Sequence, residues 1–171
     1  MKRITILLAL LLALGATLFA QEVESPYVGE QHRTIKALSA QEIDGFLYGH
    51  GMGFAKVAEL NHYPGPKHVL DLAGELGLSE AQIAQTEYVY KKMRYDAVYH
   101  GERLVEKERR LDEMFAIEEA REKGVTILIE EIAELEGKIR AAHVRAHILT
   151  KEILTPEQVM RYDGLRGYET K

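Results

Sequence analysis

The chain has 171 residues with no cysteine and no tryptophan, and its 22 basic and 27 acidic side chains give a formal net charge of −5. The absence of cysteine excludes disulfides, thiolate metal sites, a cysteine nucleophile and a lipoprotein anchor. The acidic balance disfavours nucleic acid as a partner, because proteins that bind it usually carry a basic field.

The first 20 residues have the layout of a signal peptide. Lys2 and Arg3 precede an uncharged, largely apolar run that ends in small residues. This run is shorter than the roughly 20 residues of a membrane-spanning helix. We therefore expect cleavage after Ala20 and a periplasmic protein. Leu18 stands where a small residue is preferred, and an uncleaved segment would instead attach the protein to the membrane.

Residues 21–38 are polar and show no sustained period, which indicates a flexible lead-in. Residues 39–171 are expected to form a single all-α domain. Ser39 and Glu42 match a capping box, and the apolar spacing after them predicts a helix to about Asn61, interrupted by glycines. A rigid turn at residues 64–66 and a short helix that ends at Gly77 follow.

Two long helices are predicted next. Ser79 is the expected N-cap of a helix that continues to about residue 123, and Gly124 is expected to end it. Apolar residues then recur in steps of three and four as far as Ile153, the clearest helical period in the chain. Because the turn between the helices is short, they should form a long antiparallel hairpin. Pro156 begins a last short helix.

One Leu-[Ser/Thr]-x-x-Gln pattern opens two helices, as Leu78, Ser79 and Gln82 and again as Leu154, Thr155 and Gln158. In each copy the hydroxyl caps the helix and the amide reaches back to the capping residue. Behind an export signal and without cysteine, the pair resembles the LTxxQ repeat of the Spy/CpxP family of periplasmic proteins, over residues 66–168.

That resemblance implies a helical hairpin that forms a homodimer. It also implies an ATP-independent chaperone or envelope-stress accessory protein that binds unfolded or regulatory envelope proteins. The alternative, taken from the ZraP and CnrX-like branches, is a heavy-metal sensor or buffer that uses histidines on the hairpin.

His143 and His147 lie one helical turn apart on one face, the spacing that offers two nitrogen ligands to one ion. Val144 stands where a His-Glu-x-x-His protease needs its glutamate, so a metalloprotease is disfavoured. The competing interpretation places both histidines beside the apolar stripe as boundary residues. No cofactor is required, but imidazole and thioether donors suit Zn, Ni, Co or Cu. Further candidate donors are His68, His50 and Met52.

Aromatic and basic side chains gather on the first long helix. Candidate client-binding residues there are Tyr90, Met93 and Arg94, although core packing or a dimer interface explains them equally well. Acidic neighbours would neutralise a basic strip on the same helix. No nucleophile triad, acidic pair or nucleotide motif stands out, so we expect a binding protein and not an enzyme.

Overall fold

The structure is a computed structural model that describes residues 24–168. These residues divide into two compact units, one that ends at His32 and one that begins at Arg33. The first unit contains the 3-10 helix η1 (Glu30–His32). The expected signal segment, residues 1–20, lies outside the described residues. Within residues 24–168, no helix is both long and apolar enough to span a lipid bilayer.

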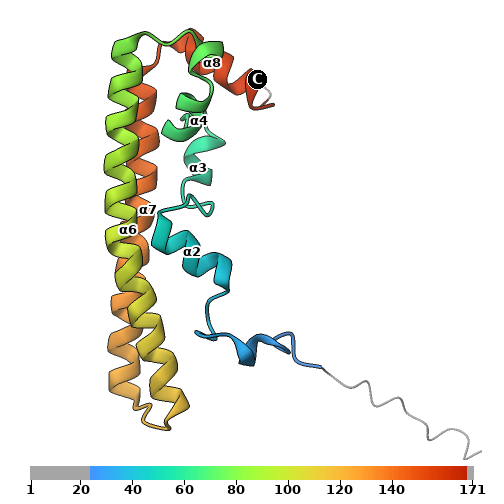
Figure 1. The fold of residues 1–171 in the computed structure, drawn as a ribbon, viewed down its shortest axis with the longest axis vertical. Coiled ribbons are helices and arrows are strands. Elements are labelled where there is room, and N and C mark those ends of the chain that lie inside the picture. Colours follow the sequence, from blue (N-terminus) through green and yellow to red (C-terminus); the bar gives the residue numbers. More distant parts are fainter. Residues whose placement is uncertain (1–23, 169–171) are drawn as a thin grey trace, which may run out of the picture. The chain divides into compact units, whose positions relative to one another are not determined.

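Two long helices form the centre of the second unit, α6 (Glu80–Ala116) and α7 (Glu122–Ile153), and they pack against each other (Figure 1). At one end, the Gln82 side-chain amide donates a hydrogen bond to the carbonyl oxygen of Ile153, 3.0 Å away. At the other end, Gly124 lies beside the Met114 side chain. The two helices therefore run in opposite directions. The prediction of an all-helical fold with two long packed helices is confirmed.

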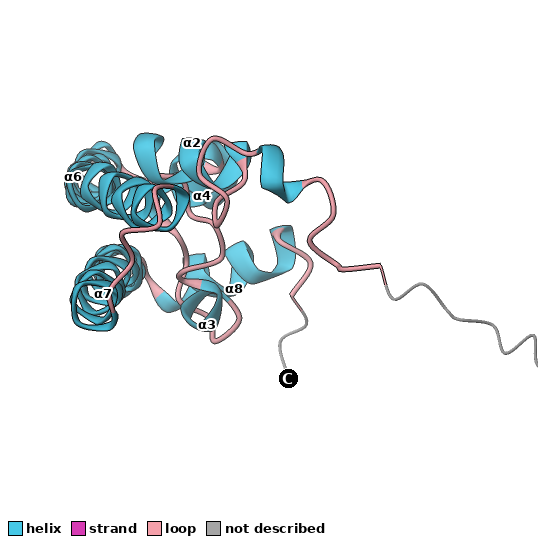
Figure 2. Cartoon of the chain, turned by 90° about the horizontal axis from the view of Figure 1, so that it is seen from below, coloured by secondary structure: helices cyan, strands magenta, loops and turns pink. Residues whose placement is uncertain are grey.

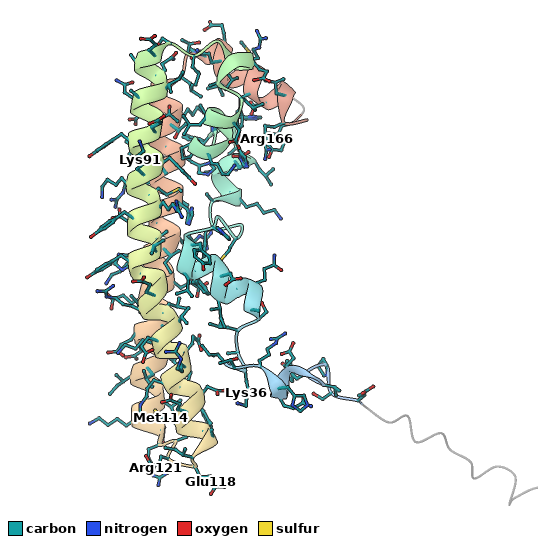
Figure 3. The ribbon with its side chains drawn as sticks, in the orientation of Figure 1. Lys36, Lys91, Met114, Glu118, Arg121 and Arg166 are labelled. Atoms are coloured by element: carbon teal, nitrogen blue, oxygen red, sulfur yellow. The ribbon has the colours of Figure 1, made fainter. Side chains whose placement is uncertain are left out.

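The turn between the long helices lies earlier than the sequence predicts. α6 ends at Ala116, and Glu118 adopts the left-handed conformation with φ +59° (Figure 3). Because α7 already begins at Glu122, Gly124 lies inside its first turn and does not end α6. The prediction was wrong here because it assigned the left-handed residue to glycine, the usual choice, whereas a glutamate adopts that conformation in this chain.

The apolar stripes of α6 and α7 meet in the core. The buried side chains of these stripes include Met93, Ala97, Leu104, Leu128, Ile139, Ala142 and Ala146. Full burial of a Leu, Ile or Met side chain contributes about 1.5–3 kcal/mol, so this seam stabilises the helix pair far more than helix propensity alone. Thr86 and Thr150 are also fully buried, and each hydroxyl donates to the carbonyl oxygen four residues earlier, at 2.7 Å.

The shorter helices all lie on one side of this pair (Figures 1 and 2). They are α2 (Ala40–Tyr48), α3 (Lys56–Glu59), α4 (Pro66–Asp71), α5 (Ala73–Leu76) and α8 (Pro156–Leu165). The helix expected from residue 39 to about Asn61, interrupted by glycines, is two separate helices, because Gly49 takes φ +66° and ends α2 in a left-handed cap. The loop that follows, residues 49–55, bends the chain before α3 begins.

The segment directly before α2 belongs to the core. Ile35 is 1 % exposed and Leu38 is 8 % exposed, and both pack with Phe46 against the long helices. Lys36 forms an ion pair with Asp112 of α6 at 3.0 Å (Figure 3). This differs from the expectation of a flexible lead-in through residue 38. Two apolar residues in a non-helical segment carry no period, so the sequence pattern does not reveal their burial.

The two copies of the Leu-[Ser/Thr]-x-x-Gln motif meet at one end of the helix pair. Both form complete capping boxes, with Ser79 and Thr155 as the N-caps of α6 and α8. The Gln82 amide nitrogen also donates to the Gln158 side-chain oxygen at 2.8 Å, and the Gln158 nitrogen lies 3.4 Å from the Leu76 carbonyl oxygen. The motif therefore joins α5, α6, α7 and α8 as well as capping two helices.

Candidate functional site

A cavity of about 500 Å³ opens between the helix pair and the segments that precede it in the chain. Its walls come from the loop after α2, the start of α4, and the facing sides of α6 and α7. Four of the donors predicted from sequence line it together: His50, His68, His143 and His147. The fold therefore brings to one place histidines that are up to 97 residues apart in the chain, a number that follows from their positions.

His147 is oriented by the backbone. Its Nδ1 lies 2.7 Å from the carbonyl oxygen of Tyr63, so Nδ1–H donates to that oxygen, and in the neutral ring Nε2 is the nitrogen with the lone pair. Histidines that bind metals usually donate their second ring nitrogen to a carbonyl or carboxylate in this way. A Cβ atom at Gly65 would lie 2.9 Å from Cε1 of this ring, so the ring can occupy its place only because residue 65 is glycine.

His143 lies one turn earlier on α7 and is 3 % exposed. Its ring stacks on Phe54, with centroids 5.8 Å apart, and its Nε2 is buried without a hydrogen-bond partner among residues 24–168. Burial, together with the nearby His147, lowers the pKa of His143 to about 4, so the imidazole is neutral at neutral pH. A buried polar atom without a partner costs about 1–3 kcal/mol, and a ligand in the cavity would remove that cost.

The other two histidines lie at the rim of the cavity. The His68 side chain is 41 % exposed, and its Nδ1 lies 3.8 Å from Glu59 Oε1. Burial and the positive charge of Arg166 lower the pKa of His68. His50 is exposed and lies beside the Tyr48 ring. The Tyr162 hydroxyl lies 3.5 Å from Nδ1 of His68, a longer contact than the 2.7 Å that orients His147.

Met52 lies apart from the four histidines. Its backbone has φ +44°, and its sulfur packs against Gly45 of α2. The side chain lines a different, open hollow together with Phe54 and Arg140. Within residues 24–168, no three His, Asp or Glu side chains stand close enough together to form a ready-made metal site. The cavity thus has four histidines in its lining, but within the described residues they do not form a preassembled metal site.

Glu59, which the sequence does not single out, lies beside the cavity residue His147. Its Oε1 accepts hydrogen bonds from three groups of the C-terminal segment: the hydroxyls of Tyr162 at 2.6 Å and Tyr168 at 3.1 Å, and Nε of Arg166 at 3.3 Å. Its Oε2 is buried without a hydrogen-bond partner in the described chain and lies 3.6 Å from Nδ1 of His147. No local signal predicts this residue, because all three of its hydrogen-bond donors are more than 100 residues away in sequence.

The three candidate client-binding residues also line this cavity. Met93 is buried, Tyr90 is half-buried, and Nε of Arg94 donates to the Tyr48 carbonyl oxygen at 3.3 Å. The exposed aromatic side chains of α6 are instead Tyr88, Tyr95, Tyr99 and Phe115. The aromatic residues of this helix therefore divide between a cavity wall and an outer face.

Ion pairs neutralise most of the basic side chains on α6. Five of the seven have an acidic partner: Lys91 with Glu87, Lys92 with Asp96, Lys107 with Glu131, Arg109 with Glu106 and Arg110 with Glu113 (Figure 3 labels Lys91). Exposed pairs of this kind contribute only about 0–1 kcal/mol each, but they cancel the local field. α6 thus presents no continuous basic strip, as the acidic neighbours in the sequence predict.

Comparison with models of protein families, with curated proteins and with solved structures found no match to this chain. The resemblance to the Spy/CpxP family therefore rests on the two motif copies. Any function has to be argued from the cavity and the exposed faces described above.

Proposed function

We propose that this protein binds one divalent transition metal ion in the cavity through His143 and His147, and that it acts as a periplasmic heavy-metal sensor or buffer. One observation carries the proposal. Two imidazoles, one turn apart on α7, face the same cavity as two further histidines, and His147 already has the hydrogen bond that orients a metal ligand.

The chemistry of these donors restricts the ion. Neutral imidazole nitrogens suit Zn, Ni, Co and Cu, whereas Mg and Ca prefer oxygen ligands. His68, which lines the same cavity, and Oε2 of Glu59, 3.6 Å from Nδ1 of His147, are candidates to complete a shell of three or four ligands. Because Glu59 also holds the C-terminal segment, its movement onto an ion would change how α8 is held. That is a route from metal binding to a signal.

Calorimetric titration of the purified protein with Zn, Ni and Cu tests the proposal. We expect one ion per chain for the wild type, and a loss of affinity of at least a hundredfold in the double variant His143→Ala/His147→Ala. His100→Ala is the matched control, because His100 lies on α6 outside the cavity lining and should leave binding unchanged. If the double variant binds as tightly as the wild type, the proposed ligands are wrong.

The exposed aromatic face of α6 favours a second candidate function, an ATP-independent chaperone or envelope-stress accessory protein. Tyr88 and Tyr95 are each 69 % exposed, and the rings of Tyr95 and Tyr99 stack with centroids 6.4 Å apart. Beside them lies an open groove lined by Leu47 and Val98. Exposed aromatic surface that is rimmed by charges suits the transient binding of unfolded segments.

An aggregation assay tests this second function. The protein in several-fold excess should suppress aggregation of a denatured client, and Tyr95→Ser/Tyr99→Ser should suppress it less, with Tyr27→Ser as the control. No suppression by the wild type would exclude the chaperone activity. The same exposed face is available to a second copy in the expected homodimer, and sedimentation of both proteins distinguishes loss of dimer from loss of client binding.

A further inference from the structure

We propose that the cavity, besides binding its metal ion, also binds a small organic di- or tricarboxylate next to it, so that the complete ligand is a metal–carboxylate complex. This inference rests on the proposed metal binding and adds a second component to it. Three features of the cavity point to it: its volume, the charge of its lining, and the position of Arg94.

The volume of the cavity exceeds what an ion needs. Water occupies about 30 Å³ per molecule in the liquid, so about 500 Å³ corresponds to on the order of 15 waters. An ion with a few waters would fill less than half of that space. Cavities of roughly 300–1,000 Å³ are typical of sites for small organic molecules. Tyr48, Tyr90 and Met93 supply a partly apolar wall for a carbon skeleton.

The charge of the residues that line the cavity favours an anionic ligand. The residues that line the cavity include Lys67 and Arg94 but no aspartate or glutamate. Neutral imidazoles bind a dication without cancelling its charge, and an uncompensated charge away from water is costly. Glu59, 3.6 Å from Nδ1 of His147, is already neutralised in part by Arg166 at 3.3 Å. A negative group brought in with the ion would supply the missing charge.

Arg94 is placed to hold that group. Its Nε is fixed by the hydrogen bond to the Tyr48 carbonyl oxygen, and within residues 24–168 it forms none of the ion pairs that neutralise its neighbours on α6. A guanidinium presents its remaining N–H groups as a fork that matches a carboxylate. Lys67, by contrast, is paired with Asp71 at 2.6 Å. Arg94 is therefore the residue expected to bind the free carboxylate end of the complex.

Equilibrium dialysis with radiolabelled malonate tests the inference on the full protein, with and without one equivalent of Zn, and with zinc measured in the same samples. Malonate is a suitable probe because it is a small dicarboxylate that chelates divalent metals. We expect one malonate per chain in the presence of Zn, and binding at least tenfold weaker in its absence. Arg94→Gln should weaken malonate binding at least tenfold and, in samples without malonate, change zinc affinity less than threefold. Arg103→Gln is the control, because Arg103 stacks on Tyr99 outside the cavity lining.

The outcomes separate the two proposals. If the wild type, offered both, binds zinc but no malonate, this inference is wrong and the metal site is unaffected. The same holds if Arg94→Gln binds malonate as tightly as the wild type. Malonate bound equally well with and without Zn also overturns it, because the anion site would then be independent of the metal. If none of the proteins binds zinc, with or without malonate, both the proposed metal site and this inference are wrong.

Discussion

Acidification should destabilise the metal-free protein through His143. This side chain is 3 % exposed, and its pKa in the folded protein is about 4, against 6.5 for the free side chain. Between these two pH values the unfolded chain binds more protons than the folded one, so the free energy of unfolding decreases as the pH falls. At ~1.36 kcal/mol per pH unit, the decrease is about 2 kcal/mol by pH 5 and about 3 kcal/mol by pH 4.

Urea unfolding at several pH values between 7.5 and 4, with a chelator present, measures this effect. His143→Gln is the comparison, because glutamine keeps a polar side chain that does not titrate, and all other titrating groups are common to both proteins. The wild type should lose about 2–3 kcal/mol more than the variant between pH 7 and pH 4. Parallel pH profiles for the two proteins would refute the reasoning, since they would mean that His143 is not held neutral by burial.

Four further substitutions test three individual contacts. Gly65→Ala should weaken metal binding at least tenfold, because its Cβ would lie 2.9 Å from a carbon of the His147 ring, and calorimetry measures the change. Tyr162→Phe should lower the free energy of unfolding by about 1.5–3 kcal/mol, measured by urea denaturation, because it removes a 2.6 Å hydrogen bond to a partly buried carboxylate. Gln82→Ala and Gln158→Ala should each cost about 1–2 kcal/mol, and a double-mutant cycle should show coupling of at least about 0.5 kcal/mol.

Matched changes serve as controls. Gly74→Ala introduces a Cβ with no atom within 4 Å and should leave metal binding unchanged. Tyr168→Phe removes a longer bond of 3.1 Å to the same carboxylate and should cost less than Tyr162→Phe. Equal losses of metal affinity in Gly65→Ala and Gly74→Ala would contradict the contact between Gly65 and the His147 ring. Equal losses of stability in Tyr162→Phe and Tyr168→Phe would contradict the stronger bond of Tyr162. Additive effects of the two glutamine changes would mean that the amides do not interact.

The long helices could be predicted because their signals are local. Ser79 and Thr155 are caps in the structure as in the sequence, and the period that leads to Ile153 is the buried stripe of α7. The predictions failed where a residue acts against its usual preference or without a periodic neighbour. Glu118 makes the turn that glycine was expected to make, and Ile35 is buried in a segment with no period.

The candidate site also has one part that the sequence predicts and one part that it does not. The four-residue spacing of His143 and His147 is visible in the sequence, because one helix carries both residues. Their meeting with His68 depends on how α4 packs against the long helices, which no local pattern encodes. Glu59 could not be predicted, because its role depends on tyrosines more than 100 residues away in sequence.

X-ray absorption spectroscopy of the zinc-loaded protein tests the metal site most directly. The proposal predicts a shell with at least two imidazole nitrogens at about 2.0–2.1 Å, and the loss of their signal in His143→Ala/His147→Ala. A shell of oxygen atoms alone, or an imidazole signal that persists in the double variant, would contradict it.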